Sequence, residues 1–281
     1  MKYLITGKNG QLAQEFIGRF EKQGIAYAAP DEAQLDITDS HCVAEAVASW
    51  KPGVILNCAA YNLVDKAEQE GEKAFAVNSA GPEHLARAAA DHQAVIVHFG
   101  SDYVFDGLKE RGLYAEEDPV NPLNVYGQSK LSGEERVEQA CPRHLILRLS
   151  WVFGAGKQNF IYKLRTWAES SEYLKIACDE FSVPTHTRTV VDCTLKAIAQ
   201  GLTGRYHLTN SGFCSRYEWA KLILATLNSS KFIRPVSMDS FNLPAARPKF
   251  SAMTNDAIAR TLGIGIPSWE ESVRSFLKDQ A

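Results

Sequence analysis

Three features of the 281-residue sequence predict an α/β fold with a parallel central sheet. Apolar bursts alternate with segments of helical periodicity through the first half of the chain. The bursts at 53–60, 94–101 and 144–153 are almost continuously apolar, as expected for strands that are covered on both faces. A glycine-rich turn follows the first burst and opens the first helical segment. Together these features predict a sheet with helices packed on both sides.

The elements of the first half follow from local pattern. Residues 2–6 are apolar and predict the first strand, and residues 11–24 carry apolar side chains at helical spacing up to Gly24. The other expected strands are 25–29, 53–60, 94–101 and 144–153, and the other expected helices are 41–51, 72–92 (kinked near Pro82) and 127–140.

The second half has a looser pattern that predicts a smaller domain. Residues 154–176 suggest a helix and a short strand, further helices are expected at 189–202 and 215–227, and prolines interrupt the tail. We expect a first domain of residues 1–154 plus about 186–204. The remainder, about 155–185 and 205–281, is expected to form a C-terminal α/β domain interleaved with it.

Composition excludes several classes of protein. The chain is 45% hydrophobic and 22% charged, and its net charge of −3 offers no basic excess for nucleic acid. The six cysteines form no Cys-x-x-Cys pair and have no histidine at metal spacing, which indicates reduced thiols in the cytoplasm and no metal centre. No apolar run approaches the roughly 18 residues that a membrane span needs, so we expect no membrane partner.

The glycine turn is compatible with either a structural turn or a dinucleotide site. Gly7 and Gly10 follow the first strand directly, and Ala13 supplies a small third position. Such a turn lets the backbone approach a pyrophosphate at the start of a helix. The acidic residue that would bind a ribose or border an adenine is less clear. Asp36 is the candidate, and the choice between NAD and NADP stays open.

Ser101, Tyr126 and Lys130 are the candidate catalytic residues. Ser101 ends a buried strand, and Tyr126 and Lys130 share one face of a helix four positions apart. A tyrosine can donate the proton that carbonyl reduction needs, and a nearby ammonium lowers its pKa. The alternative is that Tyr-x-x-x-Lys arose by chance on an ordinary helix. Agreement with Ser101 and the glycine turn favours the catalytic interpretation.

The order of motifs along the whole chain resembles one family. The segments "TGKNGQL", "NCAAYNLVDKAE", "AVNSAGPEHLA", "GSDYVFDG", "NVYGQSKLSGE", "RLSWVFG", "YHLTNSG" and "RPKFS" are similar to those of dTDP-4-dehydrorhamnose reductases, which are extended short-chain dehydrogenases/reductases. The resemblance implies a Rossmann-type doubly wound sheet and a C-terminal sugar-nucleotide domain. It further implies a cytoplasmic monomer or homodimer that uses NADPH, with NADH as the alternative, to reduce a dTDP-4-keto-6-deoxy sugar to dTDP-L-rhamnose.

The same resemblance implies roles for individual residues. Cofactor contacts would come from Gly7, Asn9, Gly10, Gln11, Leu12, Asp36, Ile37, Ala59, Ala60, Tyr61, Asn62, Asn78, Phe99, Tyr126 and Lys130. Substrate contacts would come from Ser101, Asp102, Tyr103, Val104, Phe105, Trp151 and Arg247, the last as a fork on phosphate.

Departures from the family pattern leave alternatives open. Glu180 and Ser182 replace the more usual glutamine and glycine of Asp-Gln-x-Gly-x-Pro-Thr, which keeps a reductase or epimerase for another nucleotide-linked 4-keto-6-deoxy sugar in play. A non-catalytic regulatory subunit is a third hypothesis. Some relatives form a magnesium-linked dimer. Glu15 matches one of the acidic positions, but Val190 and Val191 stand where a second glutamate is expected, so we predict no metal.

Overall fold

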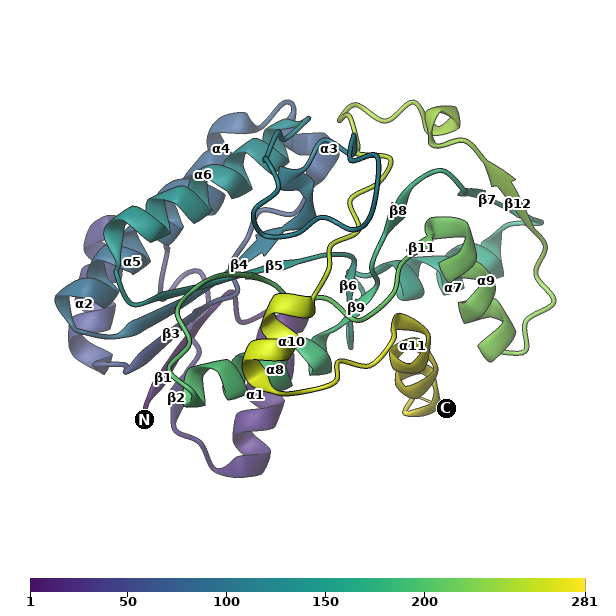
Figure 1. The fold of residues 1–281 in the computed structure, drawn as a ribbon. Coiled ribbons are helices and arrows are strands. Elements are labelled where there is room, and N and C mark those ends of the chain that lie inside the picture. The colour runs from purple at the N-terminus through teal and green to yellow at the C-terminus, as the bar shows by residue number, and fades with distance from the viewer. Residues whose placement is uncertain (281) are drawn as a thin grey trace.

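A six-stranded parallel sheet forms the centre of the computed structural model, which describes residues 1–280 (Figure 1). Its spatial order is β2, β1, β3, β4, β5, β10, so the order reverses on either side of the first strand. The strands are β1 (Tyr3–Thr6), β2 (Tyr27–Ala28), β3 (Val54–Asn57), β4 (Val95–Ser101), β5 (His144–Leu149) and β10 (Gly204–His207). This arrangement confirms the predicted Rossmann-type doubly wound fold.

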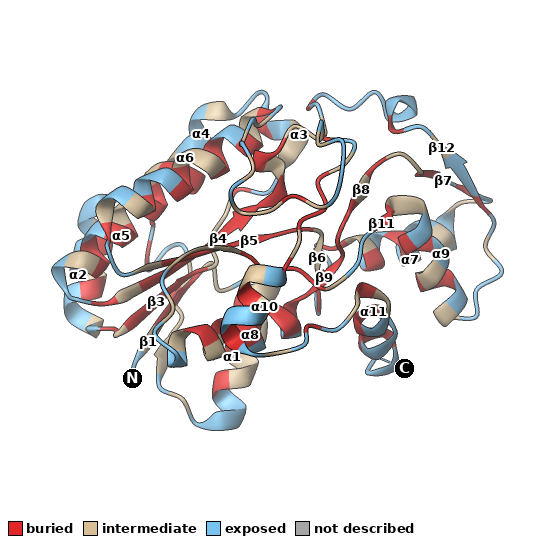
Figure 2. Ribbon diagram, in the orientation of Figure 1, coloured by how far each residue is buried: buried red, intermediate tan, exposed pale blue. Residues whose placement is uncertain are grey.

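Helices cover both faces of the sheet, as predicted. One layer contains α2 (Ser40–Trp50), α5 (Gly81–Asp91) and α6 (Val125–Ala140), and the other contains α1 (Gln11–Gln23), α8 (Thr187–Ala199) and α10 (Asp256–Leu262) (Figure 1). Each layer buries its own apolar cluster against the sheet, and the buried stripe of each helix faces inward (Figure 2). Burial of these apolar stripes is the main stabilising term of the domain.

The predicted helix 72–92 is continuous but contains a π-helical turn. It comprises α4 (Gly71–Phe75), the π-helical turn Ala76–Ala80 and α5. The irregularity therefore lies before Pro82, and the π-helical turn accommodates the N–H that this proline lacks inside the continuous helix. This turn packs against α6, and a Cβ atom at Gly133 would lie 2.0 Å from the Asn78 carbonyl oxygen. Glycine thus permits the close approach of the two helices.

The predicted strand 144–153 is interrupted. β5 ends at Leu149, and the chain resumes as β6 (Val152–Phe153), which pairs with β9 (Thr185–His186). Between them Trp151 adopts a left-handed backbone conformation with φ of 38°. A non-glycine residue rarely occupies this region, and such strain is often found at functional sites.

A smaller unit is packed at the carboxyl ends of the sheet strands (Figure 1). Its helices are α7 (Phe160–Ser170), α9 (Arg216–Thr226) and α11 (Trp269–Lys278), and its paired strands are β7 (Leu174–Ala177) with β12 (Ile233–Val236) and β8 (Phe181–Ser182) with β11 (Cys214–Ser215). Three short helical segments complete the chain, namely α3 (Val64–Ala67), Asp102–Val104 and Met238–Phe241. An apolar cluster around Phe153, Trp219 and Val273 forms the core of this unit.

The domain boundaries predicted from the sequence remain a proposal. The contacts of β10 and α10 suggest a change to them. β10 pairs with β5 at the edge of the large sheet, and α10 contributes Ile258 and Leu262 to the apolar cluster under that sheet. Both elements lie in the range 205–281 that was expected in the smaller domain, apart from Gly204. We propose that they belong to the first domain.

Candidate active site

A cavity of about 890 Å³ lies between the two units, at the carboxyl ends of the parallel strands. Its walls come from the glycine turn after β1, the ends of β3, β4 and β5, the start of α6, and the smaller unit. This is where ligands bind in open α/β sheets. Of the residues expected from the sequence, the cavity is lined by Gly10, Gln11, Leu12, Ala59, Ala60, Asn62, Phe99, Ser101, Asp102, Tyr103, Tyr126, Lys130, Trp151 and Arg247.

The glycine turn fits a dinucleotide pyrophosphate. Gly7 has φ of 66°, and a Cβ atom there would lie 2.6 Å from the Ala59 backbone nitrogen, so β1 and β3 leave no room for a side chain. Within the described chain, no side chain caps the start of α1 and no acidic residue lies in its first turn. The backbone N–H groups of that turn therefore remain free to bind an anion.

Tyr126 and Lys130 both reach the cavity from α6. The Tyr126 hydroxyl oxygen lies 3.4 Å from Asn62 Oδ1, and both residues line the cavity together with Gly10 of the glycine turn. Lys130 is almost fully buried, and its Nζ donates a 2.6 Å hydrogen bond to the Phe99 carbonyl oxygen. The i and i+4 spacing thus places a phenol and an ammonium in one cavity.

Burial displaces the pKa values of these two groups in opposite directions. It raises the pKa of Tyr126 to about 12, although the Ser101 hydroxyl acts to lower it. It lowers the pKa of Lys130 to about 8, against the opposing effect of Glu134. The expected lowering of the Tyr126 pKa by Lys130 is not seen here, because burial raises that pKa and the charge of Asp102 raises it as well. The phenol is protonated at neutral pH.

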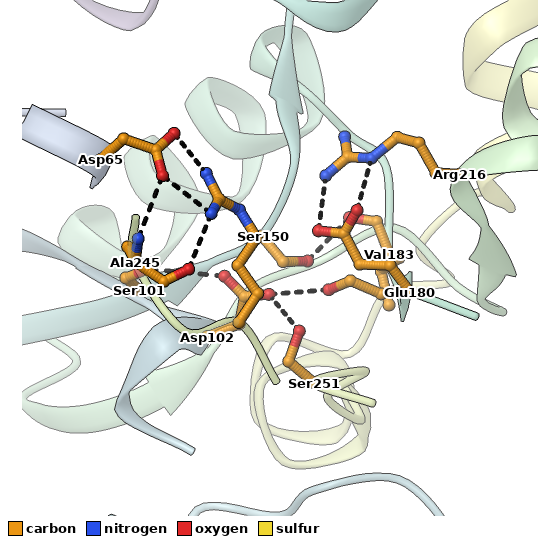
Figure 3. Close-up of polar contacts among 11 residues, drawn as sticks. Asp65, Ser101, Asp102, Ser150, Glu180, Val183, Arg216, Ala245 and Ser251 are labelled. Atoms are coloured by element: carbon orange, nitrogen blue, oxygen red, sulfur yellow. Dashed lines mark hydrogen bonds and ion pairs between the residues drawn. The ribbon is translucent and has the colours of Figure 1, made fainter. Parts of the chain in front are cut away.

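Ser101 and Asp102 follow one another at the end of β4. Ser101 Oγ accepts a hydrogen bond from the Tyr103 backbone N–H at 3.2 Å and lies 3.4 Å from Asp102 Oδ1. Asp102 Oδ2 accepts hydrogen bonds from Ser182 at 2.8 Å and Ser251 at 2.6 Å (Figure 3). Burial is the main reason that the pKa of Asp102 rises to about 6. The carboxylate ties the catalytic strand to the smaller unit.

Asn78 connects the loop after β3 to α6. Its side chain accepts a hydrogen bond from the Tyr61 N–H at 2.8 Å and donates to the Tyr61 carbonyl oxygen and to Ser129 Oγ, both at 3.0 Å. The Tyr61 hydroxyl donates to Glu70 at 2.8 Å. Asn78 and Tyr61 thus lie behind the cavity wall, where they can position cavity residues but do not line the cavity.

Several expected site residues lie elsewhere. Val104 and Phe105 are fully buried in a separate apolar cluster, where Phe105 stacks on Tyr114 at 4.1 Å. We therefore withdraw both from the expected substrate contacts. Asp36 accepts hydrogen bonds from the backbone and side chain of Thr38 within its own turn, and Ile37 is buried. Their role at an adenine stays a prediction, as does that of Gly7 and Asn9, which are not among the cavity-lining residues.

Arg247 lines the cavity, but its guanidinium fork is engaged by a protein carboxylate. Nη1 and Nη2 contact the two oxygens of Asp65 at 3.0 and 2.7 Å, and Nη1 also donates to the Ala245 carbonyl oxygen (Figure 3). The contact joins α3 to the segment before residue 250, and both residues line the cavity. A phosphate contact by Arg247 stays a prediction.

Sequence reasoning missed two polar contributors to the cavity wall. Asn159 caps α7 through Tyr162 and lies 3.3 Å from Gln11 Oε1, which joins the two units beside the glycine turn. Arg216 forms a bidentate ion pair with Glu180. Asn159 belongs to an Asn-Phe dipeptide, a weak signal, whereas nothing local distinguishes Arg216 as a cavity residue.

Across residues 1–280, no group of three or more His, Cys, Asp or Glu side chains could hold a metal ion. In the same part of the chain, no helix is both long and apolar enough to cross a membrane.

A doubly wound sheet, a tight glycine turn and a buried Tyr-x-x-x-Lys pair in one cavity define a dinucleotide-binding fold of the short-chain dehydrogenase/reductase type. The family model described as the RmlD substrate binding domain matches residues 1–281, and the chain belongs to that family. The resemblance stated from the sequence is thereby confirmed.

Individual relatives agree with this assignment. The chain is 35% identical to a dTDP-4-dehydrorhamnose reductase of Sinorhizobium fredii, over 99% of this chain and 97% of the relative. A crystal structure of a dTDP-4-dehydrorhamnose reductase from Clostridium acetobutylicum superposes with a TM-score of 0.96 at 34% identity, covering 100% and 99% of the two chains. A reductase of the same name from Bacillus anthracis, solved in complex with NADP, gives 0.95 at 33% identity and covers 99% of each chain.

Proposed function

We propose that this chain is an NADPH-dependent reductase that converts the C4 keto group of dTDP-4-dehydro-L-rhamnose to the alcohol of dTDP-L-rhamnose. The observation that carries the proposal is the placement of Ser101, Tyr126 and Lys130 in one cavity with the glycine turn. Full-length similarity to reductases of this name, one of them solved with NADP, supports the substrate and the cofactor. NADH is the alternative cofactor.

Tyr126, Ser101 and Lys130 would each have a separate role in the reduction of the keto group. The nicotinamide supplies hydride to the C4 carbon when it is bound. Tyr126 donates its phenolic proton to the keto oxygen, and its raised pKa keeps that proton in place until hydride transfer. Ser101 hydrogen-bonds the same oxygen and orients the carbonyl. Lys130 stabilises the phenolate that forms and helps return a proton from solvent.

The cofactor and the sugar nucleotide would bind at different ends of the cavity. The free N–H groups at the start of α1 would hold the cofactor pyrophosphate, and Phe99, Ala59, Ala60 and Asn62 would border the cofactor. Asp102, Tyr103 and Trp151 would face the sugar, and Arg247 the nucleotide end after Asp65 releases it.

A coupled measurement tests the proposal. The purified chain, NADPH and dTDP-4-dehydro-L-rhamnose should give loss of reduced-nicotinamide absorbance and formation of dTDP-L-rhamnose. Tight binding of both without turnover would overturn it in favour of a regulatory subunit. A panel of other nucleotide-linked 4-keto-6-deoxy sugars, each with NADPH and NADH, covers the second candidate. That candidate, a reductase for another such sugar, is favoured by the Glu180–Arg216 pair in the cavity wall.

A further inference from the structure

The ion pair between Arg216 and Glu180 in the cavity wall leaves one guanidinium nitrogen of Arg216 without a partner in the described part of the chain. Arg216 Nε and Nη2 contact the two oxygens of Glu180 at 3.2 and 3.1 Å, and the guanidinium carbon lies 3.5 Å from the centre of the Trp151 ring. In the described part of the chain, Arg216 Nη1 has no hydrogen-bond or ion-pair partner (Figure 3). Arg216 and Glu180 both line the cavity, and 19% of the Arg216 side chain is exposed.

The position of this guanidinium is fixed by backbone and stacking together. Antiparallel pairing of β8 with β11 brings the two segments side by side, and the Arg216 N–H donates to the Glu180 carbonyl oxygen at 3.1 Å. Trp151, held in its strained backbone conformation, supports the flat face of the guanidinium. A donor held on three sides loses little conformational entropy when it binds a ligand.

The pair lies at the catalytic end of the cavity. Ser182, two residues after Glu180, donates a 2.8 Å hydrogen bond to Asp102, the residue that follows Ser101, and Ser182 pairs with Cys214, two residues before Arg216. Trp151 follows the end of β5, the strand beside β4. Arg216 and Ser101 line the same cavity, so a sugar whose keto group contacts Ser101 would bring its ring hydroxyls toward Arg216.

The two departures from the family pattern both make contacts here. Glu180 anchors Arg216, and Ser182 donates to Asp102. Because Glu180 neutralises Arg216, the pair carries no net charge, so it suits a neutral hydroxyl better than a phosphate.

We propose that Arg216 is a specificity-determining residue whose Nη1 donates a hydrogen bond to a ring hydroxyl beside the keto carbon of the sugar. The proposal rests on the proposed function and deepens it. Glu180 and Trp151 act as positioning residues that hold the guanidinium in place. The chain thereby distinguishes 4-keto sugars that carry this hydroxyl from those that lack it.

Substrate analogues test the proposal directly. We would compare kcat/KM for dTDP-4-dehydro-L-rhamnose with kcat/KM for its 2-deoxy and 3-deoxy analogues, in the wild-type chain and in Arg216→Met. Methionine retains an apolar contact with Trp151 but removes every donor. The wild-type chain should prefer the parent sugar over the 3-deoxy analogue by roughly 10- to 100-fold, and the variant by less than about threefold, because C3 carries the only ring hydroxyl next to C4. The 2-deoxy analogue serves as the control. An unchanged preference in the variant would overturn the proposal.

Two further variants separate recognition from structure. Glu180→Gln should reduce the same preference in part, because the guanidinium loses its charged anchor. Arg188→Met, on α8 outside the cavity, should leave the preference unchanged. A general loss of stability lowers kcat/KM for all three sugars together and does not move their ratio, so an equal loss in Arg216→Met would count against the proposal.

Binding measurements keep this test independent of turnover. Calorimetry with dTDP-L-rhamnose and its deoxy analogues should show the same change in the affinity ratio between wild type and Arg216→Met. If the wild type binds dTDP-L-rhamnose more tightly than the deoxy analogue but shows no turnover, only the proposed function is refuted. Turnover with no discrimination between the sugars would refute the role of Arg216 alone.

Discussion

At the scale of single residues, burial disfavours the charged forms of both Tyr126 and Lys130. Tyr126 holds its proton more tightly than a free tyrosine, and Lys130 holds its proton less tightly than a free lysine. This suits a phenol that must begin the reaction as an acid. It also means that the ammonium of Lys130 is kept in a poorly solvated place at a cost to stability.

Lys130→Met should therefore stabilise the fold while abolishing most turnover. The displacement of the lysine pKa from 10.5 to about 8 opposes the charged form by roughly 3 kcal/mol. Some of this is lost with the bond to Phe99, so we expect a gain of roughly 1–2 kcal/mol at pH 7, measured by urea unfolding. Exposed Lys22→Met is the matched control. A variant less stable than wild type would contradict this account.

The pH dependence of stability follows with a definite sign. Between pH 8 and 10.5 the unfolded chain binds a proton at Lys130 that the folded chain has released. Wild-type stability should therefore gain a favourable contribution as pH rises through that window, and Lys130→Met should lack it. Unfolding curves at pH 7, 9 and 10.5, approximately, are sufficient to see the difference. Parallel pH profiles of the two proteins would count against a depressed lysine pKa.

At the scale of elements, two helical glycines offer a matched comparison. A Cβ atom at Gly133 would lie 2.0 Å from the Asn78 carbonyl oxygen, whereas one at Gly18 on α1 would meet nothing within 4 Å. Gly18→Ala should stabilise the fold by about 0.5–1 kcal/mol. Gly133→Ala should destabilise it by roughly 2 kcal/mol or more and reduce turnover, because α6 carries Tyr126. Equal stability of the two variants in thermal unfolding would refute the tight packing.

The same scale explains what could be predicted from the sequence. Continuous apolar runs identified the central strands, and Gly24 marked the end of α1, where it adopts a left-handed conformation. β10 was missed because "GRYH" has no apolar pattern of its own, and it becomes a strand only by pairing with β5. The break at Trp151 was missed for a related reason. A smooth apolar run does not reveal that Ser150 and Trp151 turn away to meet residues 183–185.

For the site, local sequence spacing predicted residues at helix and strand positions but not contacts between segments that are distant in the sequence. Tyr126, Lys130 and Ser101 were predictable because each has a fixed position on a helix or at a strand end. The Glu180–Arg216 contact joins residues 36 apart through the β8–β11 pairing, which no local pattern encodes. The burial of Val104 and Phe105 likewise depends on Tyr114, in the loop that follows them, and on Met253, which lies far along the chain.

At the scale of the whole molecule, polar contacts across the cavity hold the two units together. Asp65 with Arg247 is the most exposed of these, and its hydrogen bond with Arg247 lowers the pKa of Asp65. Asp65→Asn should cost less than about 1 kcal/mol at neutral pH, since solvent screens a partly exposed pair.

The contribution of Asp65 also has a predictable pH window. It is present above the unfolded pKa of an aspartate and is lost as pH falls through the lower, folded-state value. The stability difference between wild type and Asp65→Asn should therefore shrink on acidification below about pH 4. Chemical unfolding of both proteins along that pH series provides the measurement, and a difference that grows toward low pH would contradict the ion pair.

The central claim concerns the whole molecule as a catalyst, namely that Tyr126 supplies the proton to a ketone held in the cavity. The most direct test is turnover of dTDP-4-dehydro-L-rhamnose by Tyr126→Phe, with NADPH affinity measured alongside. We expect turnover to fall by roughly 10²- to 10⁴-fold, while NADPH affinity changes by less than about twofold because phenylalanine keeps the ring. Wild-type turnover in this variant would show that another group donates the proton.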